Sequence, residues 1–275
     1  MDSRLVSDKL LSAFSQPLPL LGYGLVDRLK LGLISLMALL ALPFLFVGNQ
    51  AYGRATTIIN HAAPKGFTIR TAFGTFYCRN YDDLLVVWPP YEAELNRFFS
   101  CDPQSVFIDV GAHVGRYTVM LAPKVKRVFS IEPNTDNFRI LLKNIELNNL
   151  CNISTLKVAC WDEVGLNRNL FLSSSPGKHS FLKPQSQFEQ VETTNLDRVV
   201  VDLHILPSEV GLLKIDAEGA ELEILKGGKE LLTSGHPKVI FEAFPQHEKN
   251  AADLLRTYGY EKIRRVGEIN FVAEK

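Results

Sequence analysis

The sequence has no excess of either charge, because 30 lysines and arginines balance 30 aspartates and glutamates. A nucleic-acid partner is normally met by a basic surface, so none is expected. C-x-x-C spacing is also missing, and the cysteines Cys78, Cys101, Cys151 and Cys160 are scattered. This pattern argues against a zinc site or a disulfide framework and fits reduced thiols in a reducing compartment.

A Gly-x-Gly-x-x-Gly loop, which pyrophosphate binders use, is absent where it would be expected. Residues 106–118 instead form an apolar run that ends in Asp109, two glycines at 111 and 115, and a stretch with helical periodicity. This is the first strand–loop–helix unit of a doubly wound sheet, which binds ligands at the carboxyl ends of its strands. Gly111 and Gly115 allow close approach of the backbone to a ligand and tight helix packing.

A second apolar strand, residues 127–131, ends in Glu132. An acid about 20 residues beyond such glycines commonly accepts hydrogen bonds from ribose hydroxyls. That spacing fits a dinucleotide or an adenosine cofactor such as S-adenosylmethionine (SAM). Because SAM has no phosphate, and its ammonium and carboxylate suit an acid beside loop amides, the pattern at Asp109 and Gly111 favours SAM.

The N-terminal part differs in character. Residues 1–30 are mixed, and residues 31–48 are free of charge, a length at the lower limit for a bilayer span. We expect a single-pass membrane anchor here, with a buried core helix or an interfacial helix as alternatives. The flanking charges barely favour a cytoplasmic N-terminus, whereas the cofactor places the catalytic domain in the cytosol. Residues 49–66 are expected to be a linker, and residues 67–100 a small cap of hairpin and helix.

The segment after Glu132 continues the alternation of helix and strand. Residues 134–148 have helical periodicity with Asn134 as N-cap, and residues 153–159 are the expected third strand. Asp162 follows, where it could accept a hydrogen bond from an adenine amine, and Trp161 could stack; a turn aspartate and a core tryptophan are the alternatives. Residues 163–190 are polar and predict an inserted hairpin or lid.

A second acidic motif follows the strand at residues 212–215, with Asp216, Glu218 and Glu221 in quick succession. Asp216 should face the ligand from a central strand end, and three carboxylates exceed what helix capping needs. Glu242 lies within the next apolar run, where a buried glutamate needs a partner or a function. A helix at 246–258 and strands at 261–266 and 268–273 predict a terminal hairpin. The expected fold is α/β, with a doubly wound, mostly parallel sheet over residues 101–275.

Three motifs in this order resemble the FkbM family of SAM-dependent methyltransferases. They are Asp109-Val110-Gly111-Ala112-His113-Val114-Gly115, Ile131-Glu132-Pro133, and the stretch Leu213 to Glu221. His113 stands where the family pattern has asparagine, which keeps a hydrogen-bonding side chain and adds a titratable one. The resemblance implies a class I methyltransferase, Rossmann-like sheet and methylation of hydroxyls of sugars, polyketides or lipids. The hydrophobic N-terminal segment lies outside it.

The candidate residues fall into three groups. Asp216 and Glu218 are the candidate catalytic residues, since a hydroxyl nucleophile needs a base or a metal. Glu221 and Glu242 are substrate-side candidates, and a divalent metal stays open because carboxylates alone do not show one. The residues expected to hold SAM are Asp109, Gly111, His113, Gly115, Glu132 and Asp162.

The acceptor itself is not named by the sequence. Protein side-chain methylation, for example of lysine, is the main alternative to O-methylation. An NAD(P)-linked oxidoreductase and a membrane-tethered module without catalysis are alternatives from other classes. The glycine spacing and the predicted terminal hairpin disfavour the first, and the presence of Asp109, Glu132 and Asp216 disfavours the second.

Overall fold

The computed structural model describes residues 22–41, 58–59, 61–173, 177 and 179–275. The chain divides into two compact units, Met1–Ala93 and Glu94–Lys275. The unit boundary falls within the segment expected to form the cap, and the other expected domain boundaries stay predictions.

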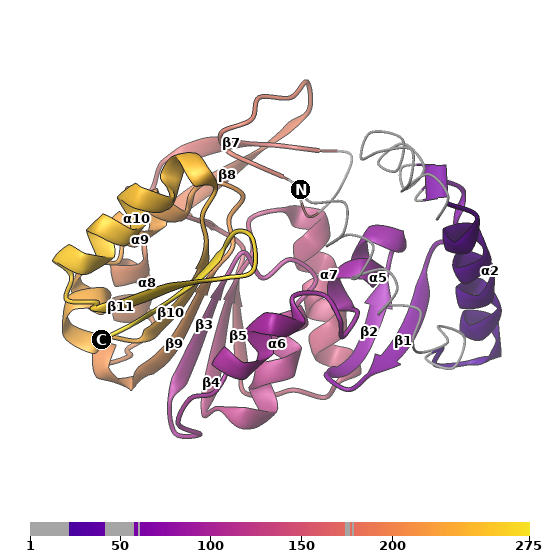
Figure 1. Ribbon diagram of the computed structural model, residues 1–275, viewed down its shortest axis with the longest axis horizontal. Helices are drawn as coiled ribbons and strands as arrows, with labels where there is room; N and C mark the ends of the chain where they lie inside the picture. The colour runs from indigo at the N-terminus through magenta and orange to yellow at the C-terminus, as the bar shows by residue number, and fades with distance from the viewer. Residues whose placement is uncertain (1–21, 42–57, 60, 174–176, 178) are drawn as a thin grey trace. The chain divides into compact units, whose positions relative to one another are not determined.

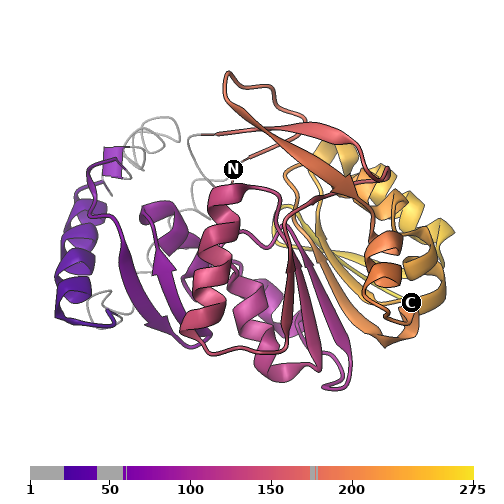
Figure 2. The ribbon, with the colours of Figure 1, turned by 180° about the vertical axis from the view of Figure 1, so that it is seen from behind.

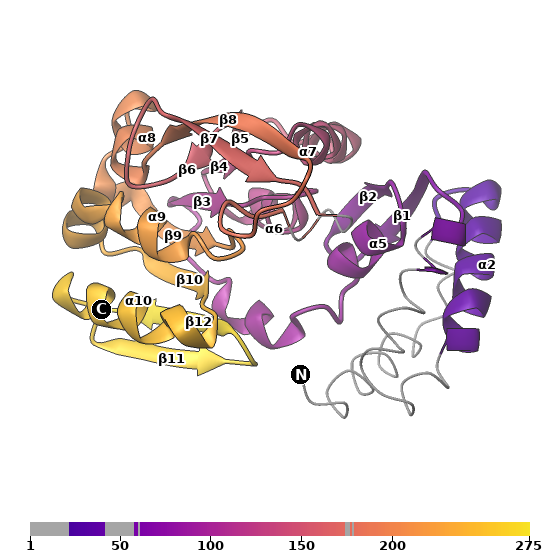
Figure 3. The same ribbon diagram turned by 90° about the horizontal axis from the view of Figure 1, so that it is seen from above.

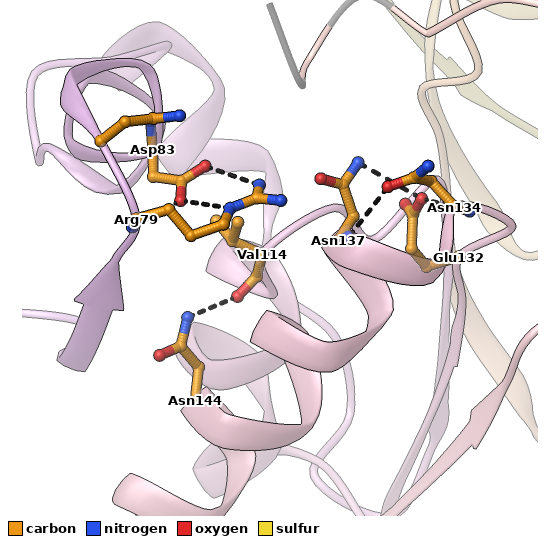
Figure 4. Close-up of polar contacts among 8 residues, drawn as sticks. Arg79, Asp83, Val114, Glu132, Asn134, Asn137 and Asn144 are labelled. Carbon is orange, nitrogen blue, oxygen red and sulfur yellow. Dashed lines mark hydrogen bonds and ion pairs between the residues drawn. The ribbon is translucent and has the colours of Figure 1, made fainter. Parts of the chain in front are cut away.

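The described part of the N-terminal unit includes a hairpin with helices before and after it. These are α2 (Leu25–Ala41), β1 (Phe67–Thr71), β2 (Gly74–Cys78) and α5 (Tyr81–Val87). Strands β1 and β2 pair antiparallel from Phe67↔Cys78 to Thr71↔Gly74, which confirms the expected hairpin. Helix α5 begins after Asn80, whose side chain accepts a hydrogen bond from the Asp83 amide, and Asp83 forms a 2.8 Å ion pair with Arg79 (Figure 4).

Helix α2 does not match the expected membrane span over residues 31–48. It begins at Leu25 and so includes Asp27, Arg28 and Lys30 before the uncharged run. Residues 42–48 lie outside the described residues. Across the described part of the chain, no helix is both long and apolar enough to cross a membrane. The single-pass membrane anchor, and with it the expected location of the protein at a membrane, are therefore not supported.

The packing of α2 explains the apolar run in a different way. Leu31, Ile34 and Ala38 lie on one stripe of the helix and are buried, and α2 packs against β1 (Figure 1). The Lys30 Nζ donates a hydrogen bond of 2.6 Å to the carbonyl oxygen of Gly66. This stripe corresponds to the core-helix alternative.

The second unit is built on a seven-stranded sheet with the order β11-β12-β10-β9-β3-β4-β5. Its strands are β3 (Val106–Val110), β4 (Arg127–Ile131), β5 (Ile153–Leu156), β9 (Val210–Ile215), β10 (Lys238–Glu242), β11 (Lys262–Val266) and β12 (Asn270–Glu274). The five strands from β10 to β5 run parallel. The chain passes from β3 outward to β4 and β5 and then returns to β9 beside β3. This makes β3 and β9 the switch point at which such sheets bind ligands.

Helices connect these strands. They are α6 (Arg116–Leu121), η3 (Ala122–Lys124), α7 (Thr135–Leu147), α8 (Leu196–Asp202), η5 (Pro207–Glu209), α9 (Glu221–Lys226), η6 (Leu231–Gly235) and α10 (Pro245–Thr257), after the 3-10 helix η2 (Ala93–Phe98). An apolar core joins β3, β4, β9 and β10 to α8, α9 and α10. Asn134 caps α7 as expected, accepting a 3.0 Å hydrogen bond from the Asn137 amide.

The third expected strand, residues 153–159, is shorter than predicted. Strand β5 ends at Leu156, and all its residues are only half-buried, as suits an edge strand. The chain then enters a separate sheet of order β6-β8-β7, formed by β6 (Ala159–Cys160), β7 (Asn167–Phe171) and β8 (Phe188–Thr194). The β7–β8 hairpin projects from the large sheet (Figures 1 and 2) and confirms the inserted hairpin, although β8 continues beyond residue 190.

The last two strands close the opposite edge of the sheet. Strand β12 pairs antiparallel with β10 and with β11, and Figure 3 shows both strands beyond β10. The expected mostly parallel sheet with a terminal antiparallel hairpin is confirmed.

Candidate active site

Asp109 is the last acid of β3 and is 1% exposed. The Thr118 hydroxyl donates to its Oδ2 at 2.6 Å, and the Ser130 hydroxyl lies 2.7 Å from that of Thr118. The other carboxylate oxygen, Oδ1, is buried and has no hydrogen-bond partner among the described residues. Burial raises the pKa of Asp109, while Lys214 and Thr118 act in the opposite direction. Asp109 therefore offers one buried acceptor oxygen.

Gly111 brings the ends of β3 and β9 together. Its φ is +77°, and a Cβ there would lie 1.8 Å from the Asp216 carbonyl oxygen. The amides of Gly111 and Ala112 both donate to the Ile131 carbonyl, at 2.9 and 3.0 Å. The Gly111 amide thus donates within the protein, and the close approach at Gly111 is to the neighbouring strand end. A contact of Gly111 with SAM stays a prediction.

Gly115 serves the start of helix α6. It has φ of +88°, and a Cβ would lie 2.7 Å from Leu141 Cδ1 of α7. The Asn144 side chain on the same helix donates to the Val114 carbonyl at 2.8 Å (Figure 4). Helix α7 thereby holds the glycine loop in place, and a direct cofactor contact of Gly115 stays a prediction.

Glu132 is held by backbone amides on both of its carboxylate oxygens. Oε2 accepts from the His113 amide at 2.8 Å. Oε1 accepts from the Asn134 amide at 3.0 Å, and Figure 4 shows Glu132 beside Asn134. His113 has φ of +51°, a left-handed conformation in which Asn, Asp and His are all enriched. This explains why histidine can stand where the family pattern has asparagine, and it links His113 to Glu132 through the backbone.

Asp162 lies just after β6. Its Oδ1 is buried without a hydrogen-bond partner in the described part of the chain, so it remains available to a donor. Trp161 belongs to the apolar core, where Phe181 meets its ring edge-on with 5.7 Å between centroids and the Arg168 guanidinium lies 4.3 Å from the ring centroid. This is the core-tryptophan alternative.

Asp216 follows β9, and its side chain is 26% exposed. The Lys214 Nζ donates to Asp216 Oδ2 at 2.9 Å, while the Asp216 amide donates to the Val110 carbonyl at 3.0 Å. Asp216 is therefore fixed at the switch point between β3 and β9 and is accessible there, as a candidate base requires.

Glu221 is 2% exposed and stabilises the loop before α9. Its Oε1 accepts from the amides of Ala217 and Gly219 at 2.9 and 3.1 Å. Burial raises the pKa of Glu221. These contacts describe a residue that shapes the loop at 216–220, and its expected contact with substrate stays a prediction.

Glu218 carries a φ of +51° and meets the inserted segment. The Ser180 hydroxyl donates to the Glu218 carbonyl at 2.9 Å, and the Lys183 Nζ lies 3.9 Å from the Glu218 Oε2. Lys183 also lies 4.8 Å from the ring centroid of Phe244. The insertion thus contacts the loop that bears both catalytic candidates.

Glu242 ends β10 and is 7% exposed. Phe241 pairs with Ile215, so Glu242 lies level with Asp216, while its antiparallel neighbour is Asn270. The described residues contain no group of three or more histidine, cysteine or acidic side chains that could hold a metal ion. The substrate contact of Glu242 stays a prediction.

Sequence reasoning assigned no role to Thr118, Ser130, Lys214 or Ser180. Ser130 and Lys214 are the partners of Asp109 in the parallel register on either side of β3, a relationship that appears only once β3, β4 and β9 are aligned. Thr118 could have been found, since it lies on the first helix after the glycine loop. Ser180 had no signal in the sequence.

This arrangement, a switch point flanked by acidic strand ends in a mostly parallel sheet closed by an antiparallel hairpin, is a methyltransferase-like α/β fold. Comparison with family models matches residues 109–264 to the methyltransferase FkbM domain. The chain belongs to the FkbM methyltransferase family.

Individual relatives are more distant. Methyltransferase 1 of Beauveria bassiana (strain ARSEF 2860) is 23% identical over 145 residues, which are 45% of this chain and 58% of that protein. The crystal structure of methyltransferase FkbM from Methylobacillus flagellatus KT is 16% identical, with a TM-score of 0.47, over 66% of this chain and 46% of that one. TYW2 of M. jannaschii, solved in complex with AdoMet, is 14% identical with a TM-score of 0.46, over 78% of this chain and 86% of that one. The chain therefore spans about half the length of the first two.

Proposed function

We propose that this protein is a SAM-dependent methyltransferase that methylates a hydroxyl of a sugar, a lipid or another metabolite. The observation that carries the proposal is a pair of buried carboxylate oxygens, Asp109 Oδ1 and Asp162 Oδ1, that have no hydrogen-bond partner among the described residues. Buried acceptors are normally satisfied, so this pair is consistent with donors supplied by a ligand.

The chemistry of SAM fits this set of acceptors. Asp109 would receive the ammonium group, and Asp162 the exocyclic amine of adenine. Glu132 would accept from a ribose hydroxyl. Its Oε2 accepts from the His113 amide, and its Oε1 accepts from the Asn134 amide and the Asn137 side-chain amide. Asp109 lies near the end of β3, and Glu132 and Asp162 follow β4 and β6. The loop after Asp109 contacts Glu132 through the His113 amide.

The bound cofactor supplies a methyl group on a sulfonium, which an acceptor displaces in line. The protein must orient the acceptor and take up its proton. Asp216 is the candidate base: its partly exposed carboxylate accepts the hydroxyl proton while the oxygen of that hydroxyl gains the methyl group. Lys214 fixes the orientation of Asp216, and Glu218 lies two residues further along, where the inserted segment contacts the loop.

Calorimetric titration of the full-length protein with S-adenosylhomocysteine tests the cofactor site. We expect wild-type protein to bind and Asp109→Ala and Asp162→Ala each to bind about tenfold more weakly or worse, since a hydrogen bond to a charged group contributes about 1.5–3 kcal/mol. Asp202→Ala, which removes an exposed partner of Arg198 on α8, should leave the affinity unchanged. Binding of NADH instead, or equal binding by Asp109→Ala, would contradict the proposal.

The acceptor class needs a separate experiment. Methyl-labelled SAM is incubated with the protein and with separated pools of small metabolites, lipids and proteins. We expect label in a metabolite or lipid pool, as an ether that survives mild base. Label in protein that is released as methyl-lysine after complete hydrolysis would support the alternative of side-chain methylation.

A further inference from the structure

Lys214 is a buried cation at the centre of the sheet. Its side chain is 3% exposed. The register of β3 and β9 pairs Lys214 with Asp109, and Asp216 follows two residues later on the same face. Ser130 on β4 pairs with Asp109 from the other side. Two acids and one lysine therefore lie in neighbouring positions on one face of the sheet.

The contacts of Lys214 show how its charge is held. Its Nζ donates to Asp216 Oδ2 at 2.9 Å and lies 4.7 Å from the ring centroid of Tyr117 on α6. The Phe99 ring stacks on the Tyr117 ring, with 4.5 Å between the two centroids. A buried ammonium is stable only with compensating partners, and this packing prevents it from turning towards solvent.

Both neutral and charged groups lie near Lys214. Ile240 of β10 pairs with it and carries no charge, and Thr118 contributes a hydroxyl to Asp109. Arg116 lies 5.3 Å from the Tyr117 ring centroid, and Glu242 ends β10 level with Asp216. Lys214 donates to Asp216 and offsets its negative charge, which leaves the Asp109 carboxylate for a cationic ligand.

We infer that Lys214 is a positioning residue of the methyltransferase site, whose buried ammonium offsets the negative charge of Asp216 and favours the ionised form of Asp109. The inference rests on the proposed function, since Asp109 is taken to meet the ammonium of SAM and Asp216 the acceptor. Lys214 thereby joins the cofactor half of the site to the acceptor half.

The physical reason is that two neighbouring carboxylates in a low-dielectric environment resist simultaneous ionisation. Without Lys214, the charge of Asp216 is uncompensated, and Asp109 retains a proton more readily. Asp109 is the more buried of the two, and burial already raises its pKa against the effect of Lys214. A protonated Asp109 is a poor partner for an ammonium group, so cofactor affinity becomes dependent on pH.

The experiment measures binding of S-adenosylhomocysteine to full-length protein between pH 6 and 8, for wild type, Lys214→Met and Lys214→Arg. We expect weak binding by Lys214→Met at pH 6 that recovers with rising pH, by up to about tenfold per pH unit for one linked proton. Lys214→Arg retains the charge and should stay closer to wild type. Lys124→Met, a change at an exposed lysine on η3, should follow wild type throughout.

Two further measurements separate this role from a structural one. 5′-Methylthioadenosine lacks the ammonium, so Lys214→Met should bind it without the pH dependence. In Lys214→Met/Asp216→Asn only one of the two acids remains, and affinity at pH 6 should recover. If Lys214→Met does not fold, Asp216→Asn alone serves: Lys214 then acts on Asp109 only, and binding should persist to lower pH than in wild type.

The outcomes are distinct. A loss in Lys214→Met that is equal at every pH, no loss at all, or an unchanged acid limit in Asp216→Asn would overturn the role of Lys214. If wild-type protein binds no S-adenosylhomocysteine, the proposed function fails, and this inference fails with it.

Discussion

Gly111 and Asp216 are in contact through their backbones: a Cβ on Gly111 would lie 1.8 Å from the Asp216 carbonyl oxygen. The Asp216 amide in turn donates to the Val110 carbonyl at 3.0 Å. The motif at Asp109 and the motif at Asp216 are therefore in contact through their backbones, without any ligand between them. Whatever displaces Gly111 also displaces the candidate base.

Replacing Gly111 with alanine should destabilise the fold strongly. The left-handed φ alone costs about 1–2 kcal/mol for a residue with a Cβ, and the overlap adds about 1–3 kcal/mol. Gly165 provides the matched control, because its φ is +75° with no atom within 4 Å of a Cβ. Urea unfolding should show a loss of about 3 kcal/mol or more for Gly111→Ala and about 1–2 kcal/mol for Gly165→Ala. Equal losses would mean that the contact with Asp216 is unimportant.

Asn134→Ala should affect both stability and cofactor binding. The change removes the cap of α7, which typically costs about 1 kcal/mol, and frees the segment whose amide holds Glu132. Asn195 is the matched control. Its side chain caps α8 by accepting from the Arg198 amide at 2.7 Å, and α8 is distant in sequence from Glu132. Thermal unfolding should show similar losses for Asn134→Ala and Asn195→Ala. S-adenosylhomocysteine titration should show weaker binding for Asn134→Ala alone, and a parallel effect in both would contradict a link to Glu132.

Much of this site follows from local sequence. An apolar run that ends in an acid predicted Asp109, Glu132 and Asp216 at strand ends, because β-branched residues and a following glycine are local signals. The cap at Asn134 was predicted because an asparagine just before a helical stretch is also a local signal.

Contacts between distant segments could not be predicted. The pairing of Asp109 with Lys214 joins strands about a hundred residues apart along the chain, and it depends on the register of β3 and β9. The bond from Ser180 to the Glu218 carbonyl depends on how the inserted hairpin folds back. Neither contact leaves a periodic signal in the sequence.

The unsupported prediction of a membrane anchor at residues 31–48 has a physical explanation. A run without charges looks the same whether lipid or protein covers it. Hydropathy could not show that the helix begins at Leu25, nor that Leu31 and Ile34 are buried as one stripe. The contact of α2 with β1 is again a relationship between distant segments.

Asp109→Asn should stabilise the protein at neutral pH while it weakens cofactor binding. Burial raises the pKa of Asp109 from its ordinary value of 3.8. Folding therefore favours the protonated form, and the wild-type protein loses stability as the pH rises through the folded-state pKa. Asparagine carries no charge and avoids this loss. Calorimetric melting should show a higher Tm for Asp109→Asn at pH 7, with the difference shrinking as the pH falls towards 4. A difference that grows in acid would contradict the raised pKa.

Ser180→Ala should loosen the contact between the inserted segment and the Glu218 loop. The Ser180 hydroxyl donates to the Glu218 carbonyl at 2.9 Å and accepts from the Leu182 amide at 3.2 Å. A Cβ on Gly219 would lie 3.2 Å from Leu182 Cδ1, so the same segment also packs over this loop. Loss of such bonds costs about 1 kcal/mol, which corresponds to roughly fivefold faster local opening.

Hydrogen exchange measures this opening directly. We expect faster exchange of the amides at 181–183 and 217–219 in Ser180→Ala, with unchanged exchange in β3 and β4. Ser234→Ala removes an exposed hydroxyl that donates to Glu230 Oε1 at 2.8 Å and should leave these amides unaffected. Ser180 contacts the loop of Glu218 and not the cofactor candidate Glu132. Affinity for S-adenosylhomocysteine should therefore stay at the wild-type value. A loss of that affinity without faster exchange would place Ser180 with the cofactor instead of with the loop of the candidate base.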